Sequence, residues 1–451
     1  MTTYRSYFEV KKALQKKRTT CLEITQNYLN RIVKNSHLNA FVEVYSDESL
    51  FQAKQVDKKI SKGKAGKLAG LVFAIKDNIC YKGHKVSAGS KILKGFESLF
   101  TATAVQKLLD QDAIIVGRLN CDEFGMGSAN ENTIYGAVKN PYNTSKVAGG
   151  SSGGSASAVS AGLCLVALGS DTGGSIRQPA SFCGVVGLKP TYSRVSRHGL
   201  IAYASSFDQI GPLANNVDDA SLVLEVIAGT DNFDSTVSRR KPEKYSRANF
   251  DNKPKKIAYI SECLDREGLD PEIKEFLKCK ISQLKKKGHS VDPISLPELD
   301  LLVPVYYIIS TAEASSNLAR FDGVHYGYRS ESASDLENTY INSRTEGFGE
   351  EVKRRIMLGT FVLSADYHDS YFTKAQKIRR LIQNKTKAMF EKYDFIISPT
   401  TPHTAFSIGK KHTNPTTMYL EDIFTVQANL VGLSGGWSPS VNLFSQSGGK
   451  L

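Results

Sequence analysis

Apolar residues along this chain alternate between helical spacing and short continuous runs. Helical spacing predicts amphipathic helices over residues 4–15, 20–34, 46–62, 101–112, 217–228, 270–287 and, with a break, 350–393. The second helix is expected to begin with a capping box, formed by Thr20 and Glu23. Short apolar runs predict buried strands at residues 71–75, 113–117, 163–168, 184–188, 256–260 and 395–400. Helices that alternate with buried strands in this way are typical of an α/β fold built in layers.

Glycine and serine concentrate in residues 148–179, where two glycine-rich turns flank a helical segment and a strand. The first turn, 149–155, continues into small helix-forming residues instead of staying polar as a linker would. The second turn, 169–175, follows the apolar run and precedes a short helical start at 176–179. Paired glycines let backbone N–H groups approach a ligand closely. Such turns therefore favour a site for a phosphate or an oxyanion.

Ser175, at the end of the second turn, favours the oxyanion site, because a hydroxyl beside those N–H groups is placed to act as a nucleophile. Neither turn has the Lys-Ser/Thr pair of a phosphate loop or the spacing of a dinucleotide site. Ser152 is a rival, since residues 150–154 match the G-x-S-x-G nucleophile elbow. A turn precedes it instead of a strand, and no histidine lies in a recognisable catalytic pattern, so a Ser-His-Asp triad has little support.

Without a histidine base, a buried and therefore neutral lysine is the next candidate. Lys76 directly follows the apolar run 71–75, which is an unusual place for a side chain that normally reaches the surface. An isolated lysine at a strand end would ordinarily be solvated, and that is the competing interpretation.

Three motifs together carry a family resemblance: FAIKDNI at 73–79, AGGSSGGSASAVSAG at 148–162 and GSDTGGSIRQPA at 169–180. They resemble the amidase signature family, whose members hydrolyse amides with a Ser-Ser-Lys triad. The resemblance implies one large α/β domain with a central mixed sheet and helices on both faces. It also implies Lys76 as general base, Ser151 as the middle serine after a cis peptide, and Ser175 as nucleophile. The implied oxyanion hole consists of the backbone N–H groups of Ser175 and of Thr172, Gly173 and Gly174.

Within the family, the chain is most similar to the glutaminase subunits of aspartyl/glutamyl-tRNA amidotransferases. The supporting stretches begin at Glu123, Tyr306 and Gly347. The resemblance implies glutamine as the substrate and ammonia as the product. It further implies a B subunit that activates misacylated tRNA with ATP and magnesium, and a small C subunit that braces the pair. This chain would then need no cofactor of its own, and whether Glu-tRNA(Gln), Asp-tRNA(Asn) or both are served is left open.

Glutamine carries two charges that the pocket must recognise. Its α-carboxylate suits a guanidinium, which binds a carboxylate bidentately, and its α-ammonium suits a carboxylate. By resemblance, Arg355, Asp422 and Tyr306 line the pocket, with Arg354 as the alternative to Arg355. The polar, glycine-dotted segment 121–136 is expected to form a wall of the pocket. Its candidate substrate-binding residues are Gly127 and Ser128.

Composition restricts the class of protein. The hydrophobic content of 41% and the charged content of 23% indicate a folded globular protein. The formal net charge of +13 permits a nucleic-acid partner, but the lysine clusters lack interleaved aromatics, so solvated surface is the default interpretation and a face toward tRNA the alternative. Seven cysteines without C-x-x-C or metal spacing indicate reduced thiols, a cytoplasmic location and no metal site. No apolar segment approaches the roughly 20 residues of a membrane span, so no membrane partner is expected.

The length of 451 residues alone would suggest about three domains. The motifs that must meet are spread from Lys76 to beyond residue 350, so we predict a single amidase signature domain over residues 1–433. Residues 434–451 depart from the family pattern, and we predict an atypical, truncated tail that leaves a sheet edge uncovered. The alternatives for function are a free-standing amidase for another small amide and, because of this tail, a non-catalytic subunit.

Overall fold

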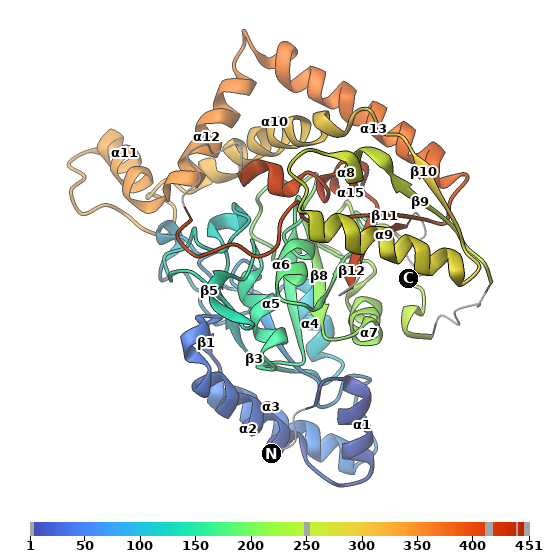
Figure 1. Cartoon of the computed structure of the whole chain (residues 1–451). Coiled ribbons are helices and arrows are strands. Elements are labelled where there is room, and N and C mark those ends of the chain that lie inside the picture. The colour runs from blue at the N-terminus through green and yellow to red at the C-terminus, as the bar shows by residue number, and fades with distance from the viewer. Residues whose placement is uncertain (1–3, 248–252, 411–417, 439–440, 446–451) are drawn as a thin grey trace.

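One mixed sheet organises the molecule. The computed structural model describes residues 4–247, 253–410, 418–438 and 441–445, and within them eleven strands form this sheet (Figure 1). The strands, in order across the sheet, are β1 Phe41–Val44, β3 Ile114–Leu119, β2 Val72–Lys76, β6 Val166–Asp171, β8 Gln209–Ala214, β7 Val186–Lys189, β12 Ser434–Ser438, β13 Val441–Ser445, β11 Phe395–Ser398, β9 Lys256–Ile260 and β10 Ser290–Ile294. A separate ribbon pairs β4 Lys139–Asn140 with β5 Asn143–Val147.

The middle of the sheet positions the site. β2 runs parallel to both β3 and β6, while β6 runs antiparallel to β8. Every residue of β2, β3 and β6 is buried, because helices cover both faces of these strands. Parallel strands end at the same edge of a sheet, so the residues that follow β2 and close β6 lie together there. The expected α/β fold with a mixed central sheet is confirmed.

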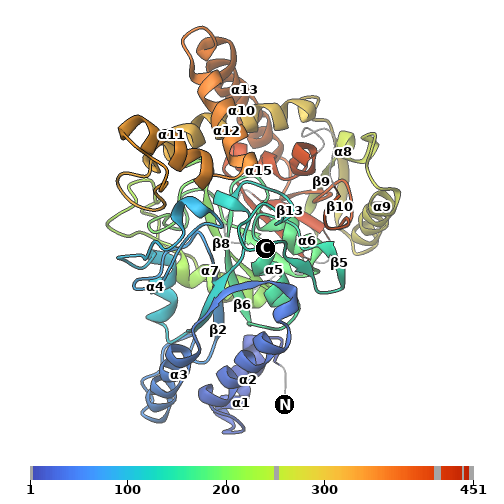
Figure 2. The ribbon, with the colours of Figure 1, turned by 90° about the vertical axis from the view of Figure 1, so that its left-hand side faces the viewer.

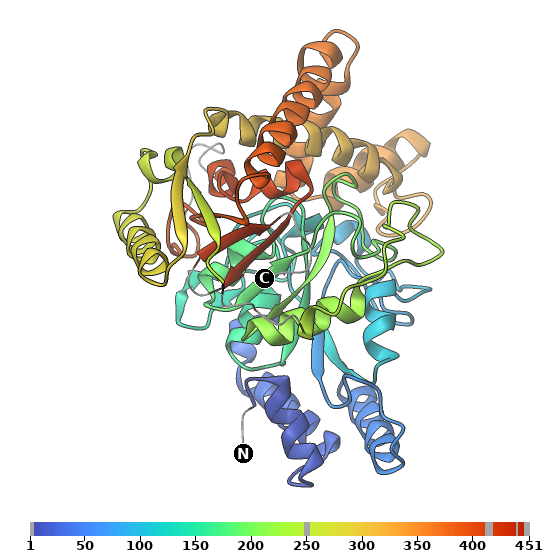
Figure 3. The same ribbon diagram turned by 90° about the vertical axis from the view of Figure 1, so that its right-hand side faces the viewer.

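The helices divide into groups at opposite ends of the molecule. α1 to α3 lie together at one end, whereas α10 to α13 cover the other end and α9 lies beside β9 and β10 (Figures 2 and 3). The helices are α1 Tyr7–Gln15, α2 Cys21–Lys34, α3 Ser46–Ser61, α4 Thr103–Leu109, α5 Gly153–Ser160, α6 Arg177–Phe182, α7 Val217–Ile227, α8 Ser261–Asp265, α9 Pro271–Lys286, α10 Leu299–Asn317, α11 Leu336–Gly347, α12 Glu350–Leu363, α13 Lys374–Phe390 and α15 Val426–Val431. None of the described helices is long and apolar enough to span a bilayer.

Most predicted elements are present, with one shift that matters for the site. The capping box predicted at Thr20 forms, with the Thr20 hydroxyl accepting from the N–H of Glu23. The strand predicted at 163–168 begins and ends too early in the sequence. Residues 161–165 form a turn, and β6 continues through Gly169 to Asp171. These polar residues remain in the sheet because they pair with β8, with Asp171 opposite Gln209. The second glycine-rich turn is therefore shorter than predicted.

The chain after residue 433 is part of the main sheet. β12 pairs antiparallel with β7, and β13 pairs antiparallel with both β12 and β11. Lys189, at the end of β7, also donates from its buried amino group to the carbonyls of Pro190, at 2.7 Å, and of Leu433, at 2.5 Å. Residues 434–438 and 441–445 thus join the two halves of the sheet, at the place where the sequence predicts an uncovered edge.

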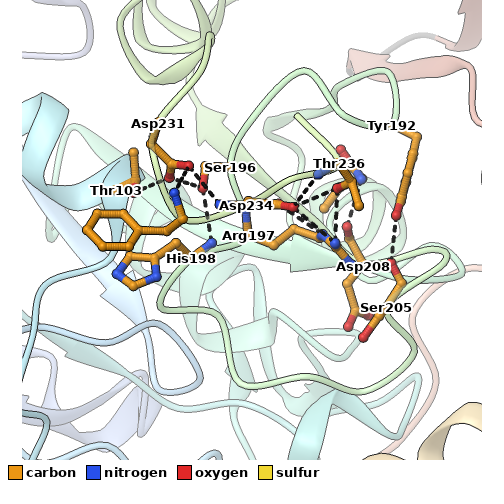
Figure 4. A network of polar contacts seen from close by, with 12 residues as sticks. Thr103, Tyr192, Ser196, Arg197, His198, Ser205, Asp208, Asp231, Asp234 and Thr236 are labelled. Carbon is orange, nitrogen blue, oxygen red and sulfur yellow. Dashed lines mark hydrogen bonds and ion pairs between the residues drawn. The ribbon is translucent and has the colours of Figure 1, made fainter. Parts of the chain in front are cut away.

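Two surface loops are fixed by half-buried carboxylates. Figure 4 shows Asp231 and Asp234, in the loop after α7, directed toward the loop after β7. Asp231 accepts from the hydroxyl of Thr103 at 2.6 Å and from the backbone N–H of Asp234 at 2.9 Å. Although burial raises the pKa of Asp234, hydrogen bonds from Arg197 and Thr236 lower it to about 2. Asp234 is therefore ionised at neutral pH and holds Arg197 in an ion pair of 3.2 Å.

Candidate active site

Lys76 ends β2 in the centre of the sheet and is fully buried. Its Nζ lies 2.7 Å from Ser151 Oγ and 2.9 Å from Ser170 Oγ. Burial lowers the pKa of this lysine, because the ammonium loses its hydration while the amine loses little. The alternative of a solvated lysine at a strand end is wrong. A lysine whose pKa is lowered by burial and whose amino group contacts a serine hydroxyl can act as a general base.

Ser151 is held at the start of α5 by a narrow glycine turn. The Gly150–Ser151 peptide bond is cis. The backbone N–H of Gly150 donates to the carbonyl of Ser128 at 2.9 Å, and the N–H of Asp122 donates to the carbonyl of Ser151 at 3.2 Å. A Cβ at Gly150 would overlap the Asp122 carboxylate and lie 2.8 Å from the N atom of Ala129. Only glycine fits here, and this close packing aims the Ser151 hydroxyl at Lys76.

The turn over residues 172–175 presents unpaired backbone N–H groups. Among the described residues, none accepts a hydrogen bond from the backbone N–H of Thr172, Gly173, Gly174 or Ser175. The carbonyl of Gly173 accepts from the Thr425 hydroxyl at 2.5 Å, which fixes the turn from behind. Gly174 has a φ of +152°, where a Cβ would overlap that same threonine. This arrangement can bind an oxyanion beside the Ser175 hydroxyl.

A buried ion pair braces this turn. Arg177 donates to both carboxylate oxygens of Asp171, each at 3.0 Å, and neither side chain is exposed. Burial alone would raise the pKa of Asp171, but the Arg177 guanidinium lowers it to about 2. Asn429 donates to the same carboxylate at 2.9 Å, and Arg177 donates to the carbonyl of Thr425 at 2.9 Å. The brace therefore connects both ends of the turn to the start of α15.

Ser152, the rival nucleophile, has its hydroxyl in use. Ser152 Oγ donates to the carbonyl of Ser170 at 3.1 Å and accepts from the N–H of Ser170 at 3.3 Å. Ser152 is fully buried, whereas Ser175 keeps 9% of its surface exposed. The turn predicted before the elbow is wrong in part, because β5 covers Asn143–Val147, but this strand belongs to the separate β4–β5 ribbon and not to the main sheet. Ser152 thus connects α5 to β6, which is a structural role.

Cys183 is the cysteine nearest in sequence to Ser175. Its thiol donates to the carbonyl of Ala148 at 3.3 Å, and burial raises its pKa. A buried thiol without a nearby cation is a poor nucleophile. Among the described residues, no group of three or more His, Cys, Asp or Glu side chains could hold a metal ion.

Arg355 lies inside the protein among tyrosines, while its neighbour Arg354 is exposed. The Arg355 guanidinium carbon lies 5.7, 5.1 and 5.5 Å from the ring centres of Tyr203, Tyr307 and Tyr419. Its Nη1 donates to the hydroxyl of Tyr203 at 2.9 Å. Its Nε donates to Glu351 at 2.8 Å. Of the two candidate arginines, Arg355 is therefore the one that faces the interior.

Asp422 is buried close to Arg355, whose charge acts on it. The hydroxyl of Tyr307 donates to Asp422 at 2.9 Å, and the Ser128 hydroxyl lies 3.5 Å from it. Burial raises the pKa of Asp422 to about 7, while Tyr307 and Arg355 act in the opposite direction. Tyr306 packs on Gly173, where a Cβ would lie 2.6 Å from the tyrosine hydroxyl.

Of the predicted pocket residues, Ser128 and Arg355 thus act on Asp422, and Tyr306 packs on Gly173 of the turn. Gly127 instead faces the carboxylate of Asp122, where a Cβ would lie 2.6 Å from Oδ1. Sequence reasoning missed Tyr203, Tyr307 and Tyr419 around the guanidinium. They come from three separate segments without a shared local pattern, so no sequence signal would have grouped them.

Comparison with known proteins agrees with this geometry. Residues 23–441 match the family described as Amidase. The chain is 51% identical over 433 residues to the A subunit of glutamyl-tRNA(Gln) amidotransferase from Chlorobium phaeobacteroides, covering 95% of this chain and 91% of that protein. The solved structure of the corresponding A subunit from Thermotoga maritima is 38% identical, with a TM-score of 0.76 over 95% of this chain and 90% of that one. Peptide amidase from Stenotrophomonas maltophilia is 28% identical, with a TM-score of 0.82 over 98% and 93% of the two chains. The chain belongs to the amidase signature family.

Proposed function

We propose that this chain is the glutaminase subunit of a tRNA-dependent amidotransferase and hydrolyses glutamine with Lys76, Ser151 and Ser175. The observation that carries the proposal is the fully buried Lys76 amine, 2.7 Å from the Ser151 hydroxyl. The N–H groups of residues 172–175, directly after β6, have no acceptor among the described residues and support the same reaction. The identity of about half of all positions to relatives named as the A subunit of glutamyl-tRNA(Gln) amidotransferase supports the same assignment.

In the proposed reaction, Ser175 Oγ attacks the side-chain amide carbon of glutamine. Its proton passes to Ser151 Oγ as the proton of Ser151 passes to the Lys76 amine. The N–H groups of residues 172–175 stabilise the resulting oxyanion, and one such donor contributes about 3 kcal/mol in the transition state. When the C–N bond breaks, the proton returns to the leaving nitrogen and ammonia departs. Water then hydrolyses the γ-glutamyl ester of Ser175 through the same proton path.

The proposed pocket matches the two charges of glutamine. The Arg355 guanidinium binds the α-carboxylate, and the Asp422 carboxylate binds the α-ammonium. Asp422 must be ionised for this role. Burial raises its pKa to about 7, and an arriving ammonium favours the ionised form. Tyr306 and Ser128 complete the pocket, with Gly127 in its wall.

The ammonia is proposed to pass to a B subunit, which uses ATP and magnesium to activate the misacylated tRNA, while a C subunit braces the complex. A direct test measures ammonia release from glutamine by the purified chain alone and with candidate B and C subunits. We expect ammonia release to rise when the partners are added. We also expect transfer of the ammonia to Glu-tRNA(Gln) or Asp-tRNA(Asn) when ATP and magnesium are present. Hydrolysis of small neutral amides in preference to glutamine would instead support a free-standing amidase.

Arg355→Ala is expected to raise KM for glutamine about 10- to 100-fold, because a charge-assisted hydrogen bond contributes about 1.5–3 kcal/mol. Hydrolysis of the neutral amide propionamide should change much less, since it has no carboxylate to bind. Steady-state kinetics on both substrates provides the measurement.

Arg354→Ala is the matched control for this substitution, because Arg354 is exposed and pairs with the same Glu351. It should leave both KM values near the wild-type values. An equal loss on glutamine and propionamide for Arg355→Ala would place Arg355 in the scaffold and contradict its role in recognition.

A further inference from the structure

Two polar residues outside the proposed triad surround the base. We propose that Ser170, fixed by Asn78, is a positioning residue that orients the Lys76 amino group so that its lone pair faces Ser151. This inference rests on the proposed triad and deepens it.

Ser170 has a fixed relation to Lys76 because the two residues lie on neighbouring strands. β2 pairs parallel with β6, with Ile75 opposite Leu168, so the last residues of both strands lie at one edge of the sheet. Lys76 Nζ is 2.9 Å from Ser170 Oγ, and Asn78 Nδ2 donates to the same oxygen at 2.9 Å. Ser170 and Asn78 are only 4% and 3% exposed, so these polar groups have few other partners.

The donors and lone pairs of Lys76 and Ser170 show how Ser170 orients the amine. A neutral amine has two N–H groups and one lone pair, and a hydroxyl oxygen has two lone pairs. The base must accept from Ser151, so its lone pair is committed there and an N–H is free to donate to Ser170. Asn78 fills one lone pair of the Ser170 oxygen, and Lys76 fills the other. Without that acceptor, rotation about the Cε–Nζ bond would often direct an N–H toward Ser151.

The same contact acts on the charged form of the base. Once Lys76 has taken the proton, its ammonium donates to both Ser151 and Ser170, and hydrogen bonds to a charged donor are the stronger ones. Burial lowers the pKa of Lys76. The side chains of Cys121, Asp122, Asp171 and Asp208 raise it. Removing the Ser170 hydroxyl leaves all four of these side chains in place.

Ser170→Ala therefore has a two-part signature. Its kcat should fall about 10- to 100-fold, less than the roughly 10²–10⁴-fold that a general base itself contributes, while KM for glutamine stays near wild type. The acidic limb of the pH–rate profile should move to lower pH, because the ammonium loses an acceptor and the lysine deprotonates more easily. A substitution that only loosened the fold would lower kcat without moving this limb. The measurement is ammonia release from glutamine across pH, using the chain in the assembly that gives full activity.

Three further variants make the test decisive. Ser152→Ala removes a buried hydroxyl that, among the described residues, bonds only the backbone of Ser170. The acidic limb of its pH–rate profile should stay at the wild-type pH. Ser170→Thr keeps a hydroxyl, so the acidic limb of its pH–rate profile should lie at the wild-type pH. If Ser170→Ala does not fold, Asn78→Ala is the second variant. It should lower kcat in the same direction, because the Ser170 oxygen then loses the donor that fixes it.

The outcomes separate this inference from the proposed function. Ser170→Ala could show wild-type kcat and an acidic limb at the wild-type pH while Lys76→Met is inactive. This result would overturn the positioning role of Ser170 but would still support the triad. For an unfolded Ser170→Ala, wild-type kinetics in Asn78→Ala would overturn it in the same way. An active Lys76→Met would refute the triad itself.

Discussion

Ser175→Ala should abolish the γ-glutamyl ester and reduce glutamine hydrolysis by up to about 10⁶-fold, as loss of a serine nucleophile does in other hydrolases. The hydroxyl of Ser175 lies in a turn whose N–H groups have no acceptor among the described residues, so attack and charge stabilisation occur in one place. Mass spectrometry of acid-quenched enzyme detects the ester, and an ammonia assay gives the rate. The fold should be retained, because no hydrogen bond of this hydroxyl holds the described structure together.

Ser152→Ala is the matched control for the nucleophile. Its hydroxyl bonds the backbone of Ser170 in both directions, so its removal should cost about 1–3 kcal/mol of folding stability and leave the ester in place. An ester that persists in Ser175→Ala and disappears in Ser152→Ala would reverse the assignment.

Lys76→Met should reduce kcat by about 10⁴-fold, at the upper end of what a general base contributes. The wild-type rate should rise with pH through the lowered pKa of Lys76. Below that pKa the amine is protonated and has no lone pair, and above it the base is competent. A pH–rate profile of kcat/KM for glutamine reports this ionisation in the free enzyme.

Lys189→Met separates this ionisation from that of a second buried lysine. Burial lowers the pKa of Lys189 to about 7, but within the described part of the chain its amino group donates only to the carbonyls of Pro190 and Leu433. The pH–rate profile of Lys189→Met should therefore keep its acidic limb at the wild-type pH. A Lys76→Met enzyme with the wild-type rate and an unchanged profile would show that another group is the base.

Local sequence accounts for much of this protein. The buried strand that ends at Lys76 and the capping box at Thr20 could be predicted, because each depends on residues within one or two turns of chain. The candidate catalytic residues could be named as well, since they lie in short glycine-rich motifs whose spacing is specific. The bounds of β6 could not be predicted, because Ser170 and Asp171 are polar and their place in the sheet depends on pairing with β8.

Helix α10 and strand β8 show the same limit. α10 contains Pro304 and is buried along most of its length, so it lacks the amphipathic spacing that marks a helix. β8 contains both glycine and proline, which disfavour strands in isolation. Both segments take their structure from neighbours that are distant in the chain, and burial against those neighbours outweighs local preference.

The sequence by itself determined which residues carry the candidate chemistry, because lysine, paired glycines and serines in these motifs have few other uses together. Tertiary structure alone decided that Arg355 and not Arg354 faces inward, that three tyrosines surround it, and that the Ser152 hydroxyl is occupied by Ser170. It also decided that the chain after residue 433 closes the sheet between β7 and β11. The physical reason is the same in each case. Burial, hydrogen-bond partners and strand pairing arise between residues that are 18 positions apart for Ser152 and Ser170 and 152 apart for Arg355 and Tyr203, and a local pattern of side chains does not encode those contacts.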